Sequence, residues 1–368
     1  MSVRREATPI RVLALVPSVF DTAPGQRFRI EQWDALLRGS GVEIVYAPFE
    51  CEELHSIISS RGRVGSKFRL VIKAFANRVS ALRRLGDFDA IYVYREAALF
   101  GPAVFEYWIK VSGAPIIFDF DDAVFIPYVS PSNGHLSRLK FPGKTRTICR
   151  LSSHVMAGNR YLAEYARRVN SNVTIVPTTI DTDKYLLESS KPESPAPVIG
   201  WSGSFSTVQH LDILRAPLRS LAAGEKFRLR VVGAPDYRLD GVEVEALPWR
   251  SRTEIEDLRV MDIGMMPLPD DDWSRGKCGL KALQYMALGI PTICSPVGVN
   301  SEIIQDGVNG FLASTEDEWI EKLTALLHSA ELRKRFGLAG RRTVKAKYSA
   351  HSQVPTVLEI FKSVAKKV

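Results

Sequence analysis

The sequence predicts an α/β protein of two domains, each built on a parallel β-sheet. Short apolar runs rich in β-branched residues alternate with amphipathic helical segments in both halves of the chain. A polar, proline-rich stretch at residues 187–197 separates the halves, as an interdomain linker would. A length of 368 residues gives each domain room for a core. We therefore expect Rossmann-like domains at residues 1–190 and 197–349.

Composition and charge narrow the class of protein. The apolar fraction of 45% is typical of globular proteins, and the net charge of +8 points to anionic partners. No nucleic-acid-binding motif accompanies this charge, so we expect no nucleic acid partner and favour sugar nucleotides or anionic lipids. Apolar runs are too short to cross a bilayer, no signal peptide is recognisable, and the cysteines show no metal-binding spacing. We expect a cytoplasmic protein.

In the first half, a glycine-containing loop follows the first predicted strand, residues 10–16. The loop carries Gly25 and Arg27 and is followed by a helix near residues 30–37. Strand, loop and helix form the start of a Rossmann-like unit, although the dinucleotide fingerprint GxGxxG is absent. Gly25 and Arg27 are therefore candidate site residues, with arginines that only solvate the loop as the alternative.

A basic amphipathic helix is predicted within residues 59–85. One expected face is apolar, and the other carries lysines and arginines, the pattern of a helix that lies on an anionic lipid surface. An ordinary domain helix with a basic outer face explains the pattern nearly as well. The expected apolar face comprises Phe68, Val71, Ile72, Phe75, Val79 and Leu82, and the expected basic face comprises Lys67, Arg69, Lys73, Arg78, Arg83 and Arg84.

Three carboxylates, Asp119, Asp121 and Asp122, follow the predicted strand at residues 114–118. The carboxyl ends of parallel strands are where open α/β sheets bind ligands. A carboxylate there can position or deprotonate a hydroxyl group of a substrate. Two alternatives remain at this point: the three carboxylates bind Mg²⁺ or Mn²⁺, or Asp122 caps the next element.

In the second half, a small-residue turn at Gly203 and Ser204 follows the predicted strand at residues 198–202. Such a turn before a helix can present backbone amides to phosphate. Further strands are expected at residues 229–232, 242–246 and 263–266.

The most informative stretch is GKCGLKALQYMALGIPTICSPVGVN, residues 276–300. Glycines flank the start of a helix expected at residues 279–288, and the amides of a helix start bind anions. Lys277, Lys281 and Gln284 have the spacing i, i+4, i+7, which predicts one helical face suited to a diphosphate and a ribose. Asn300, at the end of the stretch, is a further candidate for this site. The alternative is a surface helix with two solvated lysines.

This stretch resembles the donor-site segment of GT-B glycosyltransferases, especially glycosyltransferase family 4. QYMALGIPTICSPVG matches the second half of the family pattern, and VPTTID at residues 176–181 resembles the element that closes the first GT-B domain. The two glutamates typical of the family are replaced by Gly276 and Gln284. The variant GKCGxKxxQYMA is similar to a divergent branch in which lysines make the anion contacts.

The resemblance implies two domains that face each other across a cleft, with a C-terminal helix at 350–368 packing back on the first. It also implies sugar transfer from a nucleoside-diphosphate sugar to a glycan or lipid-linked acceptor in bacterial surface polysaccharide or glycolipid synthesis. Retention of anomeric configuration without a covalent intermediate is expected, and no metal or other cofactor.

The resemblance also assigns roles to residues. Lys277 and Lys281, with the amides at Gly203 and Ser204, would stabilise the departing diphosphate, and Gln284 would contact the ribose. Asp121 stands at the place of the family's acceptor-side histidine, beside Asp119, Gly25 and Arg27. Contact with an anionic membrane surface would bring a lipid-linked acceptor within reach. The missing glutamates favour one alternative, a non-catalytic nucleotide-sugar-binding protein or partner of an active transferase; a nucleotide-sugar isomerase is another.

Overall fold

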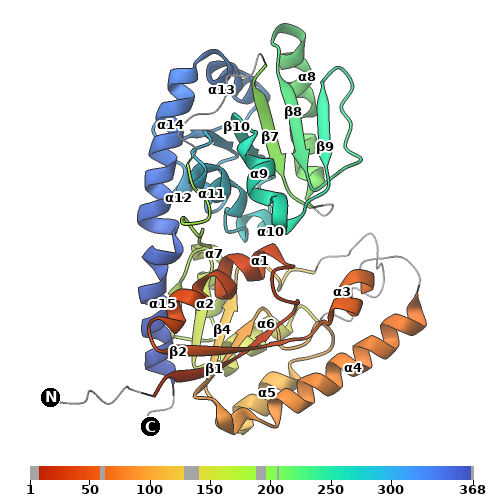
Figure 1. Ribbon diagram of the computed structural model, residues 1–368, viewed down its shortest axis with the longest axis vertical. Helices are drawn as coiled ribbons and strands as arrows, with labels where there is room; N and C mark the ends of the chain where they lie inside the picture. Colours follow the sequence, from red (N-terminus) through yellow and green to blue (C-terminus); the bar gives the residue numbers. More distant parts are fainter. Residues whose placement is uncertain (1–7, 59–62, 128–140, 188–195, 205–206, 366–368) are drawn as a thin grey trace, which may run out of the picture. The chain divides into compact units, whose positions relative to one another are not determined.

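The computed structural model describes residues 8–58, 63–127, 141–187, 196–204 and 207–365. The chain divides into two compact units (Figure 1). The first comprises Met1–Pro177 with Gln353–Val368, and the second comprises Thr178–Ser352. Among these described residues each unit contains one six-stranded sheet, and all strand pairs are parallel. The predicted fold class, two α/β domains with parallel sheets, is confirmed.

The sheet of the first unit has the strand order β2-β1-β3-β4-β5-β6. Strands β3 and β4 are buried at every position, as expected for a parallel sheet. In their register Tyr94 lies opposite Asp119, so the polar residues that follow both strands meet at the same edge. The strands are β1 (Ile10–Val16), β2 (Val42–Pro48), β3 (Ala90–Tyr94), β4 (Ile116–Phe120), β5 (His154–Ala157) and β6 (Val173–Ile175).

Helices alternate with these strands along the chain (Figure 1). The C-terminal helix α15 starts in the second unit and continues into the first. There Phe361 packs edge-on against Tyr92 of β3, with ring centroids 6.1 Å apart. The helices are α1 (Pro24–Gln26), α2 (Gln32–Arg38), α3 (Glu52–Ile58), α4 (Val64–Leu82), α5 (Val104–Val111), α6 (Lys144–Leu151), α7 (Arg160–Arg167) and α15 (Ala350–Val364), with short turns η1 (Arg27–Glu31) and η2 (Leu85–Asp87).

The predicted faces of α4 require a correction. Arg78, expected on the outer basic face, is only 2% exposed, and its guanidinium donates hydrogen bonds to the carbonyls of Ala47 at 2.7 Å and Val16 at 3.2 Å. Phe68 and Ile72, expected on the apolar face, are 67% and 53% exposed, whereas Leu82 of the same expected face is buried. Burial lowers the pKa of Arg78 to about 10, yet the side chain satisfies carbonyls at the ends of β1 and β2. Hydrophobic spacing cannot reveal an inward-facing arginine of this kind.

The sheet of the second unit has the order β12-β11-β10-β7-β8-β9. Its strands are β7 (Val198–Ser202), β8 (Arg228–Val232), β9 (Val244–Leu247), β10 (Ile263–Met266), β11 (Thr292–Cys294) and β12 (Phe311–Leu312). Its helices are α8 (Arg215–Gly224), α9 (Glu254–Arg259), α10 (Asp272–Arg275), α11 (Leu280–Ala287), α12 (Asn300–Ile303), α13 (Glu316–His328) and α14 (Ala330–Thr343), with short turns η4 (Val208–Leu214), η5 (Ser251–Thr253) and η6 (Val344–Tyr348).

Close packing fixes the position of α11 in the second unit. The chain leaves α11 through Gly289, which has a positive φ of 72°. A Cβ atom on Gly337 of α14 would lie 2.0 Å from the carbonyl oxygen of Gly289, so only glycine permits this approach. The buried guanidinium of Arg341 donates to the carbonyls of Ala287 and Tyr185. The C-terminal end of α11 is therefore tied to α14 and to the segment that enters the unit.

Candidate functional site

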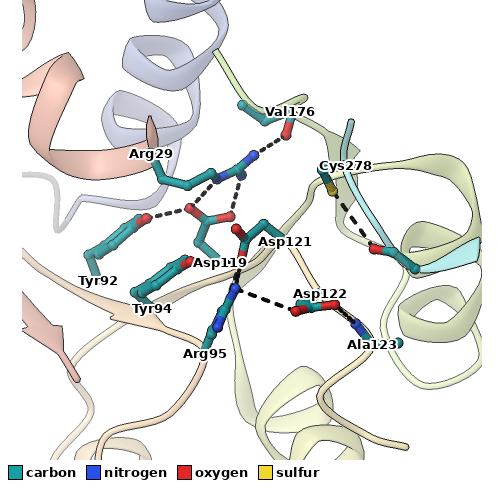
Figure 2. A network of polar contacts seen from close by, with 11 residues as sticks. Arg29, Tyr92, Tyr94, Arg95, Asp119, Asp121, Asp122, Ala123, Val176 and Cys278 are labelled. Atoms are coloured by element: carbon teal, nitrogen blue, oxygen red, sulfur yellow. Dashed lines mark hydrogen bonds and ion pairs between the residues drawn. The ribbon is translucent and has the colours of Figure 1, made fainter. Parts of the chain in front are cut away.

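The acidic cluster of the first unit is organised around a buried ion pair (Figure 2). Arg29 and Asp119 are both fully buried, and Arg29 Nε lies 2.9 Å from Asp119 Oδ2 while its Nη2 contacts Oδ1. The hydroxyl of Tyr92 also donates to Asp119, and Arg29 Nη1 donates to the carbonyl of Val176. A buried charge is tolerated only when paired in this way. Asp119, proposed from the sequence for the acceptor side, therefore lies beneath the surface and positions its neighbours.

Asp121 is less deeply buried than this pair, with a side chain that is 9% exposed, and is held by different partners. Its Oδ1 accepts hydrogen bonds from the Tyr94 hydroxyl at 2.7 Å and from Arg95 Nε at 2.8 Å. Burial by itself would raise the pKa of Asp121, but the positive charges of Arg95 and Arg29, with the hydrogen bonds, bring that pKa below its ordinary value. Asp121 is therefore an ionised carboxylate at neutral pH, suited to accept a hydrogen bond from a substrate hydroxyl.

Gly25 is packed against the partners of Asp121. A Cβ atom at Gly25 would lie 2.4 Å from the Tyr94 hydroxyl, 2.9 Å from Arg95 Nη2 and 3.0 Å from Asp121 Oδ2. Any side chain at this position would displace the cluster. The sequence-based choice of Gly25 as a site residue thus falls on a position in contact with Asp121, although whether it faces an acceptor stays a prediction.

Arg95 is a residue that the sequence reasoning did not single out. It has a positive φ of 59°, a conformation that non-glycine residues adopt rarely and that is common where function demands it. Its amide donates to the carbonyl of Asp119 at 2.7 Å, and its guanidinium lies 2.8 Å from Asp121 and 3.8 Å from Asp122. The sequence feature that could have identified Arg95 is its position directly after a buried strand.

The remaining candidates of the first unit have local partners. Arg27 Nε lies 2.7 Å from Asp21 Oδ1, and its guanidinium lies over the Phe28 ring at 5.4 Å. Asp122 Oδ1 accepts from the amide of Ala123 at 3.1 Å, a contact to the next residue, and the described residues after it form a turn, so the helix-capping role considered from the sequence stays a prediction. Within the described ranges, no group of three or more His, Cys, Asp or Glu side chains is arranged to hold a metal ion.

In the second unit, the start of α11 differs from the expectation. Gly279 has a φ of 70° and no side chain, so α11 begins without a side-chain cap at Leu280. Lys277 precedes this turn and lies over the ring of Trp273 at 4.6 Å, whereas Lys281 lies over Trp201 at 5.1 Å. The expectation that Lys277, Lys281 and Gln284 form one helical face is therefore wrong, because the left-handed glycine separates Lys277 from the helix.

Gln284 is buried, with 3% exposure, and belongs to a polar network. Its Nε2 donates to the hydroxyl of Tyr185 at 2.9 Å, and that hydroxyl donates to Glu254 Oε2 at 3.1 Å. Trp249 Nε1 donates to the other oxygen of Glu254 at 2.9 Å. The structure thus gives Gln284 a structural contact, and the ribose contact inferred from the sequence stays a prediction.

The backbone amides of Gly203 and Ser204 already donate hydrogen bonds within the second unit. The amide of Gly203 donates to the carbonyl of Val232 at 2.9 Å, and that of Ser204 donates to Thr207 Oγ1 at 3.1 Å. The prediction that these two amides bind the diphosphate is therefore corrected, since both already have acceptors. A Cβ atom at Gly203 would lie 2.2 Å from the Trp201 ring, so the glycine instead leaves room for the ring beneath Lys281.

Two buried polar atoms near these lysines have no hydrogen-bond partner in the described part of the chain. They are Asn300 Oδ1 and His210 Nδ1, on side chains that are 0% and 6% exposed. Burial, followed by the charges of Lys281 and Lys277, lowers the pKa of His210 to about 4. An unsatisfied buried polar atom is costly, and a bound ligand or water is one explanation for it. His210 was missed because a single histidine in a helical segment has no informative spacing.

Comparisons with known proteins agree with this description. Residues 196–329 match the family described as "Glycosyl transferases group 1". A stretch of 81 residues is 30% identical to spore coat protein SA of Bacillus subtilis (strain 168), and it spans 21% of this chain but only 22% of that protein.

Solved structures resemble the whole fold. A glycosyltransferase from Rickettsia africae ESF-5 has a TM-score of 0.70 at 16% identity, covering 98% of this chain and all of its own. Sucrose-phosphate synthase from Thermosynechococcus elongatus has a TM-score of 0.69 at 15% identity, covering 96% and 98% of the two chains. Anabaena Alr3699/HepE, solved in complex with UDP-glucose, has a TM-score of 0.68 at 14% identity, covering 96% and 100%.

The fold is that of the GT-B glycosyltransferases, and the second unit carries a group 1 glycosyl transferase domain. Residues 196–329 thus match group 1 glycosyl transferases within a chain of GT-B fold, as the motifs indicated. Its GKCGLKALQYMA segment is consistent with a divergent branch of family 4.

Proposed function

We propose that the protein transfers a sugar from a nucleoside-diphosphate sugar to a glycan or lipid-linked acceptor, with retention of anomeric configuration. The observation that carries this proposal is the start of α11. An uncapped helix N-terminus lies next to two lysines, Lys277 and Lys281, which are held over tryptophan rings. Helix N-termini and lysines both favour phosphate. The domain matched to group 1 glycosyl transferases includes this segment.

In the proposed reaction, negative charge develops on the diphosphate beside Lys277, Lys281 and the start of α11. The acceptor hydroxyl oxygen bonds to the anomeric carbon while the bond from that carbon to the phosphate oxygen breaks. The hydroxyl proton passes to the departing phosphate, which leaves as a nucleoside diphosphate, so no covalent enzyme intermediate is needed. Negative charge grows on the diphosphate during this step, and Lys281 and Lys277 would stabilise it more strongly in the transition state than in the ground state.

The first unit supplies the proposed acceptor residues. Asp121 is ionised and fixed by Tyr94 and Arg95, so it would accept a hydrogen bond from the acceptor hydroxyl and orient it. Asp119 and Arg29 would act beneath it as positioning residues. Metal ions have no role in this proposal, because lysines and helix amides supply the positive charge.

We further propose that α4 contacts an anionic membrane surface, which would bring the protein to a lipid-linked acceptor. Phe68 and Ile72 project from α4 with high exposure, and Arg69 and Lys73 are exposed beside them. Exposed apolar side chains flanked by cations are typical of peripheral helices. No helix in the described ranges has the length and apolar character needed to span a bilayer.

A donor screen tests the central proposal. The protein is incubated with UDP-, GDP-, ADP- and dTDP-sugars, with and without a panel of glycan and lipid-linked acceptors, and products are identified by mass spectrometry. Release of nucleoside diphosphate with formation of a glycosylated acceptor supports the proposal. Tight nucleotide-sugar binding without turnover would support a non-catalytic binding protein, the reading that the absent glutamates favour. Conversion of the sugar while it stays attached to the nucleotide would indicate an isomerase.

A further inference from the structure

We propose that His210 contacts the phosphate of the donor and becomes protonated when the diphosphate binds. The inference rests on the proposed function, because it assumes that the diphosphate occupies the start of α11. It adds a residue that no sequence motif indicates, and it makes donor binding dependent on pH in a way that can be measured.

Contacts within the second unit connect His210 to the lysines. His210 belongs to η4, and its amide donates to the carbonyl of Thr207 at 3.0 Å. Thr207 Oγ1 accepts from the amide of Ser204, in the turn that packs on Trp201. Lys281 lies over that same tryptophan ring. The charges of Lys281 and Lys277 also act on the His210 imidazole, so the ring lies near both lysines.

In the described part of the chain, one ring nitrogen of the imidazole lacks a hydrogen-bond partner. The side chain is 6% exposed, and Nδ1 is buried with no hydrogen-bond partner in the described part of the protein. Leaving such an atom unsatisfied costs about 1–3 kcal/mol, so the position is unfavourable unless something else fills it. A protonated imidazole carries a proton on both ring nitrogens, so it can donate a hydrogen bond to an acceptor such as a phosphate oxygen.

The charges around His210 explain why it is neutral before the ligand binds. Lys281 on α11 and Lys277 before α11 oppose its protonation, and Asp271 at the start of α10 favours it. Burial and the two lysines prevail, and the pKa is lowered to about 4. At neutral pH the free protein therefore holds an uncharged imidazole beside two cations.

A bound diphosphate reverses this balance. Its negative charges offset the two lysines and attract a proton to the imidazole, which then forms a charge-assisted hydrogen bond. The pKa of His210 is thus higher in the complex than in the free protein. Binding must then strengthen as the pH falls through the pKa of the complex, and the effect levels off below about pH 4, where the free histidine is also protonated.

Isothermal titration calorimetry tests the proposal. UDP, GDP, ADP and dTDP are titrated into the full chain at about pH 6 and about pH 8, in two buffers with different ionisation enthalpies, and the nucleotide that binds most tightly is used. The wild type should take up more protons at the lower pH than His210→Gln. The variant should bind about ten-fold more weakly at about pH 6, the low end for a hydrogen bond to a charged group, and nearly as well at about pH 8.

A matched control separates this effect from a general loss of histidine. His328, whose side chain is 60% exposed and paired with Glu225, is changed to Gln and should bind with wild-type proton uptake and affinity. The nucleotide's own phosphate titrates in this range, and subtracting the His210→Gln data removes that contribution. An NMR titration of the wild-type imidazole, without and with nucleotide, gives the two pKa values directly and needs no variant.

The outcomes distinguish this inference from the proposed function. If no nucleotide binds, or if Lys281→Ala leaves binding unchanged, the donor site itself is misplaced. If binding requires Lys281 but proton uptake is the same in the wild type and His210→Gln, the inference fails and the proposed function stands. An imidazole whose pKa does not rise in the nucleotide complex would overturn it as well.

Discussion

The side-chain amide of Gln284 donates a hydrogen bond to the hydroxyl of Tyr185, 99 residues earlier in the chain. Both side chains are buried, and the Tyr185 hydroxyl in turn donates a hydrogen bond to Glu254. Gln284 stands where the family pattern places its second glutamate. A glutamate here would put a second carboxylate on the same tyrosine, beside Glu254. The local network therefore gives a physical reason for the amide at this position.

Gln284→Ala should destabilise the protein, because it removes a buried hydrogen bond and leaves a cavity. A loss of about 2–4 kcal/mol is expected from the truncated side chain and the unpaired tyrosine. Urea unfolding followed by circular dichroism measures it. A variant of full stability whose only defect is weak nucleotide binding would restore the ribose role.

Lys281→Ala should raise the KM for the donor and lower kcat, because the cation acts more strongly as charge develops on the leaving diphosphate. A loss of about 2–4 kcal/mol of transition-state stabilisation is reasonable for such a group. Steady-state kinetics with the donor found in the screen provide the measurement. Lys334→Ala, at an exposed position on α14, is the matched control and should leave the kinetics unchanged. Equal kcat/KM in wild type and Lys281→Ala would assign Lys281 to packing on Trp201.

Asp121→Asn should lower kcat/KM for the acceptor while nucleotide binding stays normal, because Asp121 lies in the first unit. It should also cost stability, about 3 kcal/mol, because Arg95 loses the nearer of its two carboxylate partners. The pKa of Asp121 is lower folded than unfolded, so this contribution is fully present above the unfolded pKa, near 4, and disappears as the pH falls through the folded pKa. Unfolding curves from neutral to acidic pH should show the two proteins converging in acid. A constant stability gap down to the lowest pH would contradict the role assigned to its charge.

Activity should persist in EDTA, because the proposal places the phosphate charge on lysines and helix amides. The assay compares turnover before and after chelation and dialysis. If activity is lost and Mn²⁺ restores it, the three aspartates Asp119, Asp121 and Asp122 become candidate ligands. Asp119 would then have to leave its ion pair with Arg29.

Much of the fold followed from the sequence because parallel strands are buried and show up as continuous apolar runs. The strand at residues 10–16 was predicted at its observed bounds for this reason. The sites were harder to predict, because side-chain partners distant in sequence decide them. The Arg29 and Asp119 pair spans 90 residues, and the Gln284 contact spans 99. Helical spacing also failed at Lys277, since one left-handed glycine, Gly279, changes the direction of the chain.

Helix α4 should bind anionic lipid through its exposed cations. Each cation near such a surface contributes about 1 kcal/mol, so Arg69 and Lys73 should give measurable binding that weakens as salt rises. Vesicle co-sedimentation with phosphatidylglycerol and with neutral lipid, at low and high salt, measures it. Arg69→Gln with Lys73→Gln should abolish the preference for anionic vesicles, and Phe68→Ser with Ile72→Ser should reduce binding further.

Two controls make this test specific to α4. Lys334→Gln with Arg342→Gln removes the same charge from exposed positions on α14 and should bind vesicles like the wild type. Arg78→Gln should instead destabilise the fold, because Arg78 holds the carbonyls of Val16 and Ala47 and does not face solvent. Equal sedimentation with neutral and anionic vesicles would contradict the electrostatic account. If the wild type binds neither, α4 is an ordinary domain helix and a soluble glycan becomes the favoured acceptor.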